Sequence, residues 1–534
     1  MTLEKLYSRN HFIKITIALC FAQFCIAADI ATLAIATSSL IEQFQSNVDV
    51  LKLTGTVYPL VGASLMLTSG VIGLYIGWRR MLVVGLLLGL IGSLAKIVAP
   101  SIEWITFLAR PLIGMAGVAI LPACIALVIG HFPQKKHAQL FGLIAASTGI
   151  AAAVIPIASG FLIDTISWRS GFIVSSAFYF IGTLLAIFWI PPLNNTPPKR
   201  FDKFGTILSF FAMFCVILGL LKVPEWGVWG NTSALAYPDL VPNISPAFIL
   251  ILSGLILFVV FVKHEYRFDR LYNSALIPAQ WFKNTTFLFG LTLLLIMYVI
   301  FGGLNFTLVA FLQVGLNLTA TETGIIVLTF AASLIISSIA TPMLFKQQRK
   351  TTIACMGFLC CSLAAGMTLI STNAFSFHWP IFVAMISFGL GLGMLSSQVV
   401  AIITGSVDEA QAERTGGIQA TVRNIGLAMG ITIIAGIGQF AMEDEIRSKV
   451  TTIVSQITEI KIGINQVNNI PYITDRSLKN YLVQKNIEPN KIRILMDINA
   501  NARRTNFHTS MMAIMLFGVL GAILSMRVRA QNGA

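Results

Sequence analysis

Residues 13–38 read IKITIALCFAQFCIAADIATLAIATS, and this run holds only two charged side chains, Lys14 near its start and Asp29 in its second half. About 20 mostly apolar residues are enough to cross the hydrocarbon core of a bilayer as a helix. The apolar residues are continuous rather than alternating, which is typical of a membrane helix and not of a barrel strand. The run is also long for a signal peptide. It therefore predicts a retained first transmembrane helix.

Thirteen further runs of this kind follow along the chain. They cover roughly residues 54–76, 81–98, 105–130, 140–163, 171–190, 204–222, 246–262, 286–308, 324–344, 352–370, 380–405, 417–440 and 508–527. The composition agrees, because the 534 residues are 56% hydrophobic and only 11% charged, whereas a soluble chain is about 25% charged. The sequence predicts an all-α polytopic membrane protein with 14 transmembrane helices. It excludes a set of soluble domains, a disordered chain and a disulfide scaffold.

The distribution of Lys and Arg predicts the orientation in the membrane. If the N-terminus is cytoplasmic, the inner segments hold 20 of these residues and the short outer segments hold four, namely Lys52, Lys96, Arg169 and Lys222. Cytoplasmic loops are enriched in Lys and Arg, so we expect both termini in the cytoplasm, on the inner side of a bacterial inner membrane. The net charge of +14 then reflects topology, and no nucleic-acid partner is expected.

The runs are grouped as six, two and six. We expect an N-terminal six-helix bundle in residues 1–192, a two-helix insertion with its linkers in 193–283, and a C-terminal six-helix bundle in 284–534. Pro191, Pro192, Pro197 and Pro198 close the first group.

A long outer segment, residues 441–508, separates the last two runs. Apolar residues recur at helical spacing from Val450 to Ile464, which favours an amphipathic helix. A second helix is expected between Lys491 and Arg504. We interpret the segment as an outer cap without chemistry. The alternatives are a gate lid or a docking surface for a periplasmic adaptor.

Asp29 is the only carboxylate well inside a predicted span. A charged Asp at a helix centre costs about 3 kcal/mol, so an intramembrane acid is a functional hypothesis. Arg110 reaches a similar depth in the fourth run at 1.5 Å per residue, and we expect the two side chains to pair. Burial favours the protonated acid and Arg110 favours the carboxylate. A carboxyl group held between these effects can exchange a proton, or a cationic substrate in its place. A purely structural ion pair is the alternative.

Several short motifs carry a family resemblance. They are ADIATLAIA at 28–36, GVIGLYIGWRR at 70–80, RPLIGMAG at 110–117, PIASG at 156–160 with SWR at 167–169, FDKFG at 201–205, and GG with RNIG at 416–426. In their order and spacing they resemble the motifs of the fourteen-span drug:proton antiporters of the major facilitator superfamily. Leu74 departs from that pattern, because the family carries a gate-latching acid at this position.

This resemblance implies two six-helix halves that move by alternating access around a substrate site between them. It implies a role in proton coupling for Asp29 and Arg110. Gating and conformational roles are implied for Gly70, Gly77, Arg79, Arg80, Gly114, Pro156, Gly160, Trp168 and Arg169. The driving force would be the proton gradient, with the lipid bilayer, protons and a small molecule as partners and with no cofactor or metal.

Five further polar residues are candidates for the wall of a substrate cavity. They are Asn305, Gln313, Glu322, Gln398 and Arg423. Glu322 is more typical of an interface residue, and Arg423 has the alternative of a snorkelling anchor. With Asp29 as the one firm negative site, we expect a lipophilic monovalent cation as substrate. Arg423 leaves an anionic cargo open.

The sequence therefore predicts a proton-coupled exporter of small amphiphilic or lipophilic compounds such as drugs. One alternative is a dedicated exporter of a siderophore, lipid or metabolite on the same fold. A membrane-embedded transferase is more remote, because the six histidines form no catalytic spacing. We expect that the protein is not an enzyme.

Overall fold

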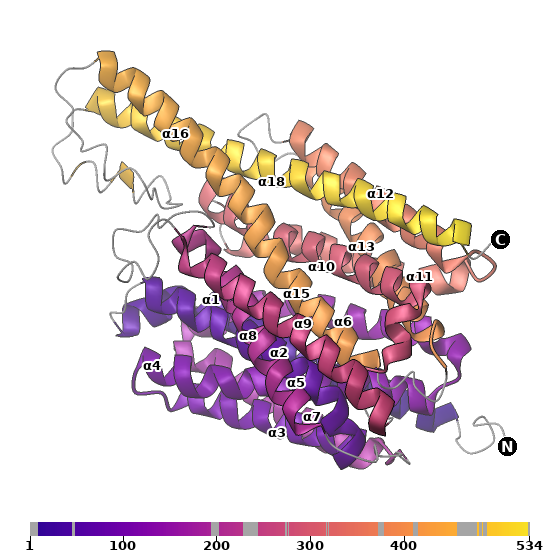
Figure 1. Ribbon diagram of the computed structural model, residues 1–534. Helices are drawn as coiled ribbons and strands as arrows, with labels where there is room; N and C mark the ends of the chain where they lie inside the picture. Colours follow the sequence, from indigo (N-terminus) through magenta and orange to yellow (C-terminus); the bar gives the residue numbers. More distant parts are fainter. Residues whose placement is uncertain are drawn as a thin grey trace.

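The protein is a bundle of long helices in the computed structural model (Figure 1). The structure describes residues 9–44, 48–193, 202–227, 244–272, 275, 277–316, 318, 320–371, 379–408, 415–456, 478–479, 483 and 489–531. Among these residues, 13 helices are long and apolar enough to cross a membrane. A further pair, Val57–Met66 and Thr68–Ile76, is bent by 55° and brings the number to 14 if it counts as one span. The prediction of an all-α polytopic membrane protein is confirmed.

The N-terminal half consists of six long helices. They are α1 (Arg9–Phe44), α2 (Val48–Ile76), α3 (Trp78–Ile97), α5 (Arg110–His131), α6 (Gln134–Thr165) and α7 (Trp168–Trp189). The short α4 (Ile102–Trp104) and the π-helical turn η2 (Ile105–Ala109) lead into α5. Aliphatic and aromatic side chains of α1, α3, α5, α6 and α7 form one buried core. This half therefore has a hydrophobic core of its own.

The C-terminal half has a second, separate core. Its helices are α10 (Thr285–Ala310), α11 (Ala320–Leu344), α12 (Lys350–Ser371), α13 (Trp379–Gly405), α15 (Thr415–Gly430), α16 (Gly436–Gln456) and α18 (Pro489–Gln531). The π-helical turns η4 (Phe311–Gly315) and η5 (Ile431–Ala435) extend α10 and join α15 to α16. Figure 1 shows the N-terminal half, in indigo and purple, beside the C-terminal half, in orange and yellow.

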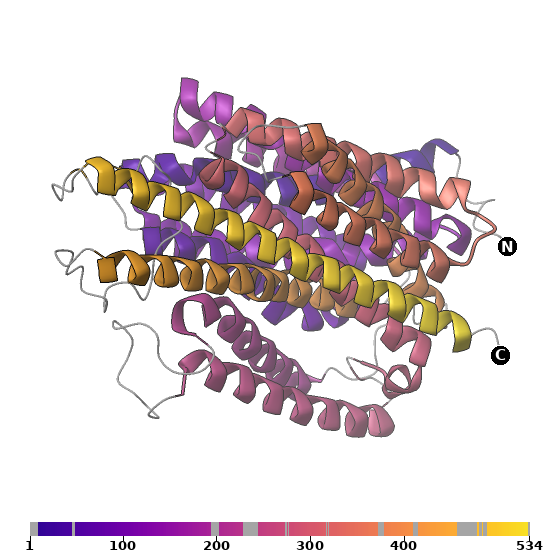
Figure 2. The ribbon, with the colours of Figure 1, turned by 90° about the horizontal axis from the view of Figure 1, so that it is seen from above.

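Two helices between the halves, α8 (Lys203–Trp226) and α9 (Pro246–Tyr272), form a hairpin on the outside of the bundle (Figure 2). A short 3₁₀ turn, η3 (Ala279–Lys283), then leads to α10. Ile217 of α8 is buried with Ala63 of α2 and Ala428 of α15. The Thr432 hydroxyl donates a hydrogen bond to the Leu220 carbonyl at 2.8 Å. The hairpin thus covers the line along which α2 meets α15.

The start of α8 explains the motif at residues 201–205. Asp202 is the N-cap, and its Oδ1 accepts a hydrogen bond from the Gly205 amide at 2.7 Å. Its other oxygen lies 2.8 Å from Nε2 of His264 on α9. A Cβ at Gly205 would lie 2.4 Å from Asp202 Oδ2 and 2.6 Å from Glu265 Oε1, so a larger residue would displace these carboxylates. The motif caps α8 and ties it to α9.

The predicted outer segment 441–508 is helical at both of its ends. Residues 441–456 belong to α16 and residues 489–508 belong to α18. The two helices extend side by side beyond the rest of the bundle (Figure 1) and share a small core of Met442, Ile446, Ile498 and Ala502. The second predicted helix, Lys491–Arg504, is part of α18. The amphipathic helix predicted at 450–464 lies largely outside the described residues.

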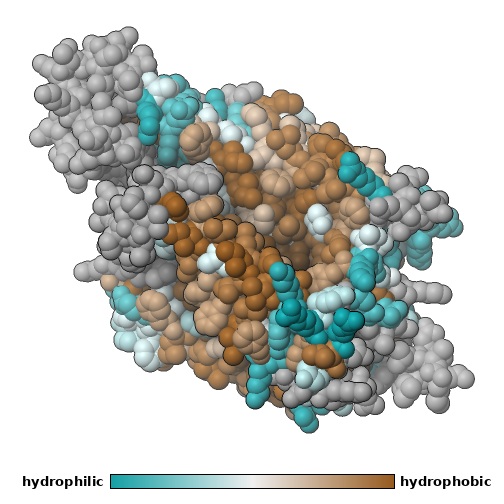
Figure 3. Space-filling model, viewed as in Figure 1, coloured by the Kyte–Doolittle hydropathy of each residue, from teal (hydrophilic) through white to brown (hydrophobic). Residues whose placement is uncertain are grey.

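The surface of the bundle is strongly apolar. On the face in Figure 3, hydrophobic side chains cover most of the middle, and hydrophilic ones gather toward its ends. Large apolar side chains are exposed on several helices, among them Phe161, Phe188, Leu255, Leu363 and Leu516. In a soluble protein such a surface would drive aggregation. It fits a protein whose solvent is the bilayer.

Candidate functional site

Three charged side chains meet in the interior of the N-terminal half. Asp29 of α1 accepts a hydrogen bond from the ammonium group of Lys96 of α3. Its second oxygen, Oδ2, lies 3.7 Å from Nη1 of Arg110 of α5. Asp29 and Lys96 are completely buried, and Arg110 is 3% exposed. One carboxylate therefore faces two cations, and this buried charge cluster of Asp29, Lys96 and Arg110 carries a net positive charge.

Small residues on α3 bring the charge cluster together. A Cβ at Gly89 would lie 2.2 Å from the ring of Tyr179 on α7. A Cβ at Gly92 would lie 2.9 Å from Ile113 of α5 and 3.1 Å from the Ala109 carbonyl. Without side chains at these positions, α5 and α7 approach α3 closely, as small residues allow in membrane helix contacts. The same approach places Lys96, one turn beyond Gly92, next to Asp29.

Neighbouring groups hold the two cations in place. The Arg110 Nε donates a hydrogen bond to the Thr54 carbonyl at 3.0 Å, and its guanidinium lies 5.3 Å from the centre of the Tyr58 ring. The Lys96 ammonium lies 4.9 Å from the centre of the Phe172 ring. Such cation–π contacts are stronger away from water. Asp29 Oδ2 and Arg110 Nη1 have no hydrogen-bond partner among the described residues. The Asp29–Arg110 pair is therefore looser than the Asp29–Lys96 pair.

Asp29 and Arg110, which were expected to pair, lie side by side in the structure. Lys96 was expected in a short outer segment, whereas it lies inside the bundle, in the last turn of α3. A signal for this position exists in the sequence. One face of α3 holds Gly85, Gly89, Gly92 and Lys96, because these residues are four, three and four positions apart.

A cavity of about 130 Å³ lies between the two halves. Its walls come from α5 and α6 on one side and from α10, α11, α13 and α15 on the other. The halves meet around it along two helix pairs. In the α2–α15 pair, a Cβ at Gly417 would lie 3.1 Å from the Gly70 Cα. In the α6–α11 pair, the Ser338 hydroxyl donates a hydrogen bond to the Gly142 carbonyl at 3.0 Å.

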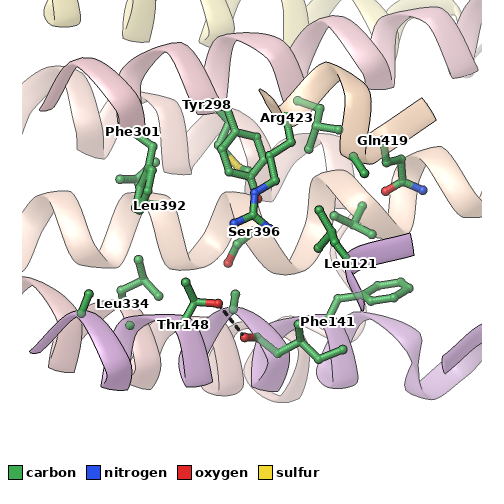
Figure 4. A pocket seen from close by; sticks show the side chains of 18 of the residues that line it. Leu121, Phe141, Thr148, Tyr298, Phe301, Leu334, Leu392, Ser396, Gln419 and Arg423 are labelled. Atoms are coloured by element: carbon green, nitrogen blue, oxygen red, sulfur yellow. Dashed lines mark hydrogen bonds between the residues drawn. The ribbon is translucent and has the colours of Figure 1, made fainter. Parts of the chain in front are cut away.

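The cavity wall is mostly apolar, with few polar side chains. Arg423 of α15 is the one charged residue among the described lining residues, and none of them is acidic. Its guanidinium lies 5.2 Å from the centre of the Tyr298 ring and extends toward Ser396 (Figure 4). The other polar lining residues are Thr148, Asn305 and Gln419. This is the usual make-up of a small-molecule site, in which few polar groups orient an apolar ligand.

The five predicted cavity residues have different positions. Asn305 and Arg423 line the cavity. The other three do not line it: Gln398 is buried in α13, Glu322 is exposed at the start of α11, and Gln313 lies in η4. Four further lining residues with a hydroxyl or amide group were not expected from the sequence, namely Thr148, Tyr298, Ser396 and Gln419. Nothing in the local sequence marks them, because the wall depends on which helix faces meet across the halves.

The conformational motifs occupy helix contacts and turns. Gly77, between α2 and α3, has φ of 91°, a conformation that favours glycine. Arg79 donates a hydrogen bond to the Ile187 carbonyl at 2.5 Å, and Arg80 is exposed. A Cβ at Gly114 would lie 2.9 Å from Val61, so α2 and α5 pack closely there. These residues shape the N-terminal half, and none of them lines the cavity.

The motifs around α6 and α7 lie near α1 and α3. α6 continues through Pro156, and the nearest neighbour of a Cβ at Gly160 would be Ile35 of α1, at 3.8 Å. Trp168 is 5% exposed, and the Arg169 guanidinium lies 4.3 Å from its ring centre. The Arg169 Nε donates to the Ile97 carbonyl at 3.1 Å and so ties the start of α7 to the end of α3.

Two half-bundles with a cavity between them are the architecture typical of membrane transporters. The chain belongs to the Major Facilitator Superfamily, whose sequence profile matches residues 19–431. The fold and the family are those of transporters and not of a membrane-embedded transferase.

Curated relatives include the probable actinorhodin transporter of Streptomyces coelicolor, 26% identical over 386 residues, which are 71% of this chain and 64% of that protein. The riboflavin transporter RibZ of Clostridioides difficile is 26% identical over 78% of this chain and 86% of its own. The multidrug resistance protein Stp of Mycobacterium tuberculosis is 23% identical, and the alignment covers 78% of this chain and 73% of that protein. This chain thus spans less than two thirds of the first of these relatives.

Among solved structures, the human organic anion transporter MFSD10 is similar in fold. The TM-score is 0.56 at 11% sequence identity, and the alignment covers 80% of this chain and 94% of that one. At this identity the similarity concerns the fold alone.

Proposed function

We propose that the protein is a proton-coupled exporter of small amphiphilic compounds that works by alternating access of the central cavity. The observation that carries this proposal is the separation of two sites. A mostly apolar cavity lies between the halves, and a buried charge cluster lies inside one half. The relatives support export, since they include the multidrug resistance protein Stp and a tetracenomycin C resistance and export protein of Streptomyces glaucescens.

In this proposal the charge cluster carries the proton. Asp29 as a carboxylate holds Lys96 of α3 and Arg110 of α5 against α1. When Asp29 takes up a proton, both cations lose their counter-charge, and their mutual repulsion favours a different arrangement of α1, α3 and α5. Because the three helices belong to one half, such a rearrangement can alter the contacts of this half with the other.

Helix α2 lies between the charge cluster and the other half. Its Tyr58 ring centre is 5.3 Å from the Arg110 guanidinium, and its Gly70 packs against Gly417 of α15, the helix that carries Arg423. A movement of Arg110 can therefore reach α15 through α2. This arrangement supports coupling between proton and substrate.

We further propose that both termini face the cytoplasm of a bacterium, as the Lys and Arg distribution favours. The cavity would then load from the cytoplasmic side and discharge outside. The paired extensions of α16 and α18 would lie on the outer side, where an adaptor has access to them.

Proton release from everted membrane vesicles tests the proposal. A pH-sensitive dye reports proton movement when ethidium, tetraphenylphosphonium, salicylate or 1-naphthoate is added. We expect a signal with at least one of these compounds for the wild type, and none for Asp29→Asn. The control Glu103→Gln removes an exposed carboxylate from α4 and should leave the signal unchanged. An undiminished signal from Asp29→Asn in correctly folded protein would contradict proton coupling at this site.

A further inference from the structure

We propose that the cavity between the halves selects aromatic compounds with an acidic group, and that Arg423 determines this selectivity. The inference rests on the proposed function and names its substrate class. It differs from the cationic substrate expected from the sequence.

The cavity wall carries a positive charge at Arg423. Arg423 forms no salt bridge with a carboxylate of the described residues, whose ion pairs involve other side chains. It is the one charged group among the described residues of a mostly apolar wall. Charges attract more strongly where the dielectric constant is low. An anionic substrate would supply the counter-charge that the described protein residues do not.

The guanidinium of Arg423 lies at the cavity wall, 5.2 Å from the centre of the Tyr298 ring, and extends toward Ser396 (Figure 4). A planar guanidinium can bind a carboxylate through two parallel hydrogen bonds. Phe301 and Phe330 add aromatic surface to the wall. The site thus combines a binding group for an acid with a wall for a flat ring.

The size of the cavity suits a small aromatic compound. The volume of about 130 Å³ is close to that of engineered cavities of about 150 Å³ that take up benzene. This conformation therefore has room for a small aromatic ring system. Gln419 is 2% exposed, and its amide nitrogen donates to Thr415 Oγ1 at 2.9 Å, within α15.

The position of Asp29 argues against a cation. Asp29 does not line the cavity, is completely buried, and already faces Lys96 and Arg110. A cationic substrate in the cavity would therefore meet Arg423 without a carboxylate beside it.

A set of three probes with the same ring tests the inference on purified protein in detergent. The probes are 1-naphthoate (anion), 1-naphthamide (neutral) and 1-naphthylmethylammonium (cation), with binding measured by equilibrium dialysis. We expect the anion to bind at least about tenfold more tightly than the amide, and the cation most weakly. A hydrogen bond to a charged group is worth about 1.5–3 kcal/mol, which corresponds to roughly a 10- to 100-fold change in affinity.

Arg423→Gln should remove this preference by weakening naphthoate binding about 10- to 100-fold, with naphthamide unchanged. Arg423→Lys keeps the charge without the planar group, so its affinity for naphthoate should fall less than that of Arg423→Gln. Arg267→Gln makes the same substitution on an exposed face of α9 and should leave the binding of all three probes unchanged. If Arg423→Gln does not fold, the inference is tested by the binding of the three probes to the wild type and to Arg423→Lys.

Equal binding of anion and amide, tighter binding of the cation, or undiminished naphthoate binding by Arg423→Gln would overturn the inference. Because dialysis needs no transport, the result is independent of the proposed function. Anion binding without proton release would contradict only the transport mechanism. Proton-coupled transport without anion preference would contradict only the substrate class.

Discussion

The ammonium group of Lys96 donates a hydrogen bond directly to the carboxylate of Asp29, between helices α3 and α1 and out of reach of solvent. Arg110 lies on the other side of the same carboxylate, 3.7 Å from Oδ2. Asp29 is therefore shared by two cations that hold different helices. The central feature is thus not the single pair of opposite charges expected from the sequence, but a triad in which one negative charge stabilises two positive ones.

Asp29→Asn should destabilise the protein strongly, because it leaves two buried cations without a counter-charge. Removing one partner of a buried ion pair typically costs about 3–5 kcal/mol. The double variant Asp29→Asn/Lys96→Met removes one of the two cations as well and should recover more than half of the lost stability. The apparent Tm of purified protein, followed by tryptophan fluorescence, measures both effects.

Lys96→Met alone serves as the control for this prediction. It leaves Asp29 with Arg110 as its partner and so should be more stable than Asp29→Asn. If Asp29→Asn were as stable as the double variant, the two cations would not depend on Asp29, and the triad would not act as a unit.

The positions of Asp29 and Arg110 could be predicted from the sequence, because membrane helices have a fixed rise and an isolated charge in an apolar run stands out. The number and order of spans follow from the same apolar runs. Lys96 was misplaced because it is two residues from the end of its predicted span, where a basic residue ordinarily reaches the interface. The glycine face that leads to Lys96 is visible in the sequence, but its significance depends on α5 and α7 packing there.

The cavity wall could be predicted only in part. Asn305 and Arg423 line it, while Gln313, Glu322 and Gln398 do not. Polarity inside a span indicates that a side chain needs a partner, and it does not tell whether that partner is a neighbouring helix or a substrate. Two halves of the chain must first be placed against each other before Gln419 or Tyr298 can be recognised as wall residues.

Gly89→Ala should destabilise the protein, although alanine favours a helix more than glycine does. The new Cβ would lie 2.2 Å from the Tyr179 ring, which is completely buried and cannot move into open space. Overpacking of this kind costs about 1–3 kcal/mol. We expect a lower apparent Tm and, because α3 is displaced from α7, weaker proton release in vesicles.

Gly436→Ala is the matched control for Gly89→Ala. It makes the same substitution in a helix, at a position where a Cβ meets nothing within 4 Å. The gain in helix propensity should make it neutral or stabilising by up to about 1 kcal/mol. Equal effects of the two substitutions would mean that helix propensity rather than close contact determines the outcome.

Asp202→Ala should loosen the first turn of α8, because it removes the acceptor for the Gly205 amide. Loss of an N-cap side chain costs about 1 kcal/mol, which corresponds to roughly fivefold faster amide exchange in this turn. Asp202→Asn retains an oxygen that can cap the helix and loses the charge that faces His264 at 2.8 Å.

Hydrogen–deuterium exchange of peptides covering residues 202–210 compares the two variants. Faster exchange in Asp202→Ala but not in Asp202→Asn would assign the effect to capping, whereas equally fast exchange in both would assign it to the contact with His264. Unchanged exchange in both would contradict a role for Asp202 at the start of α8.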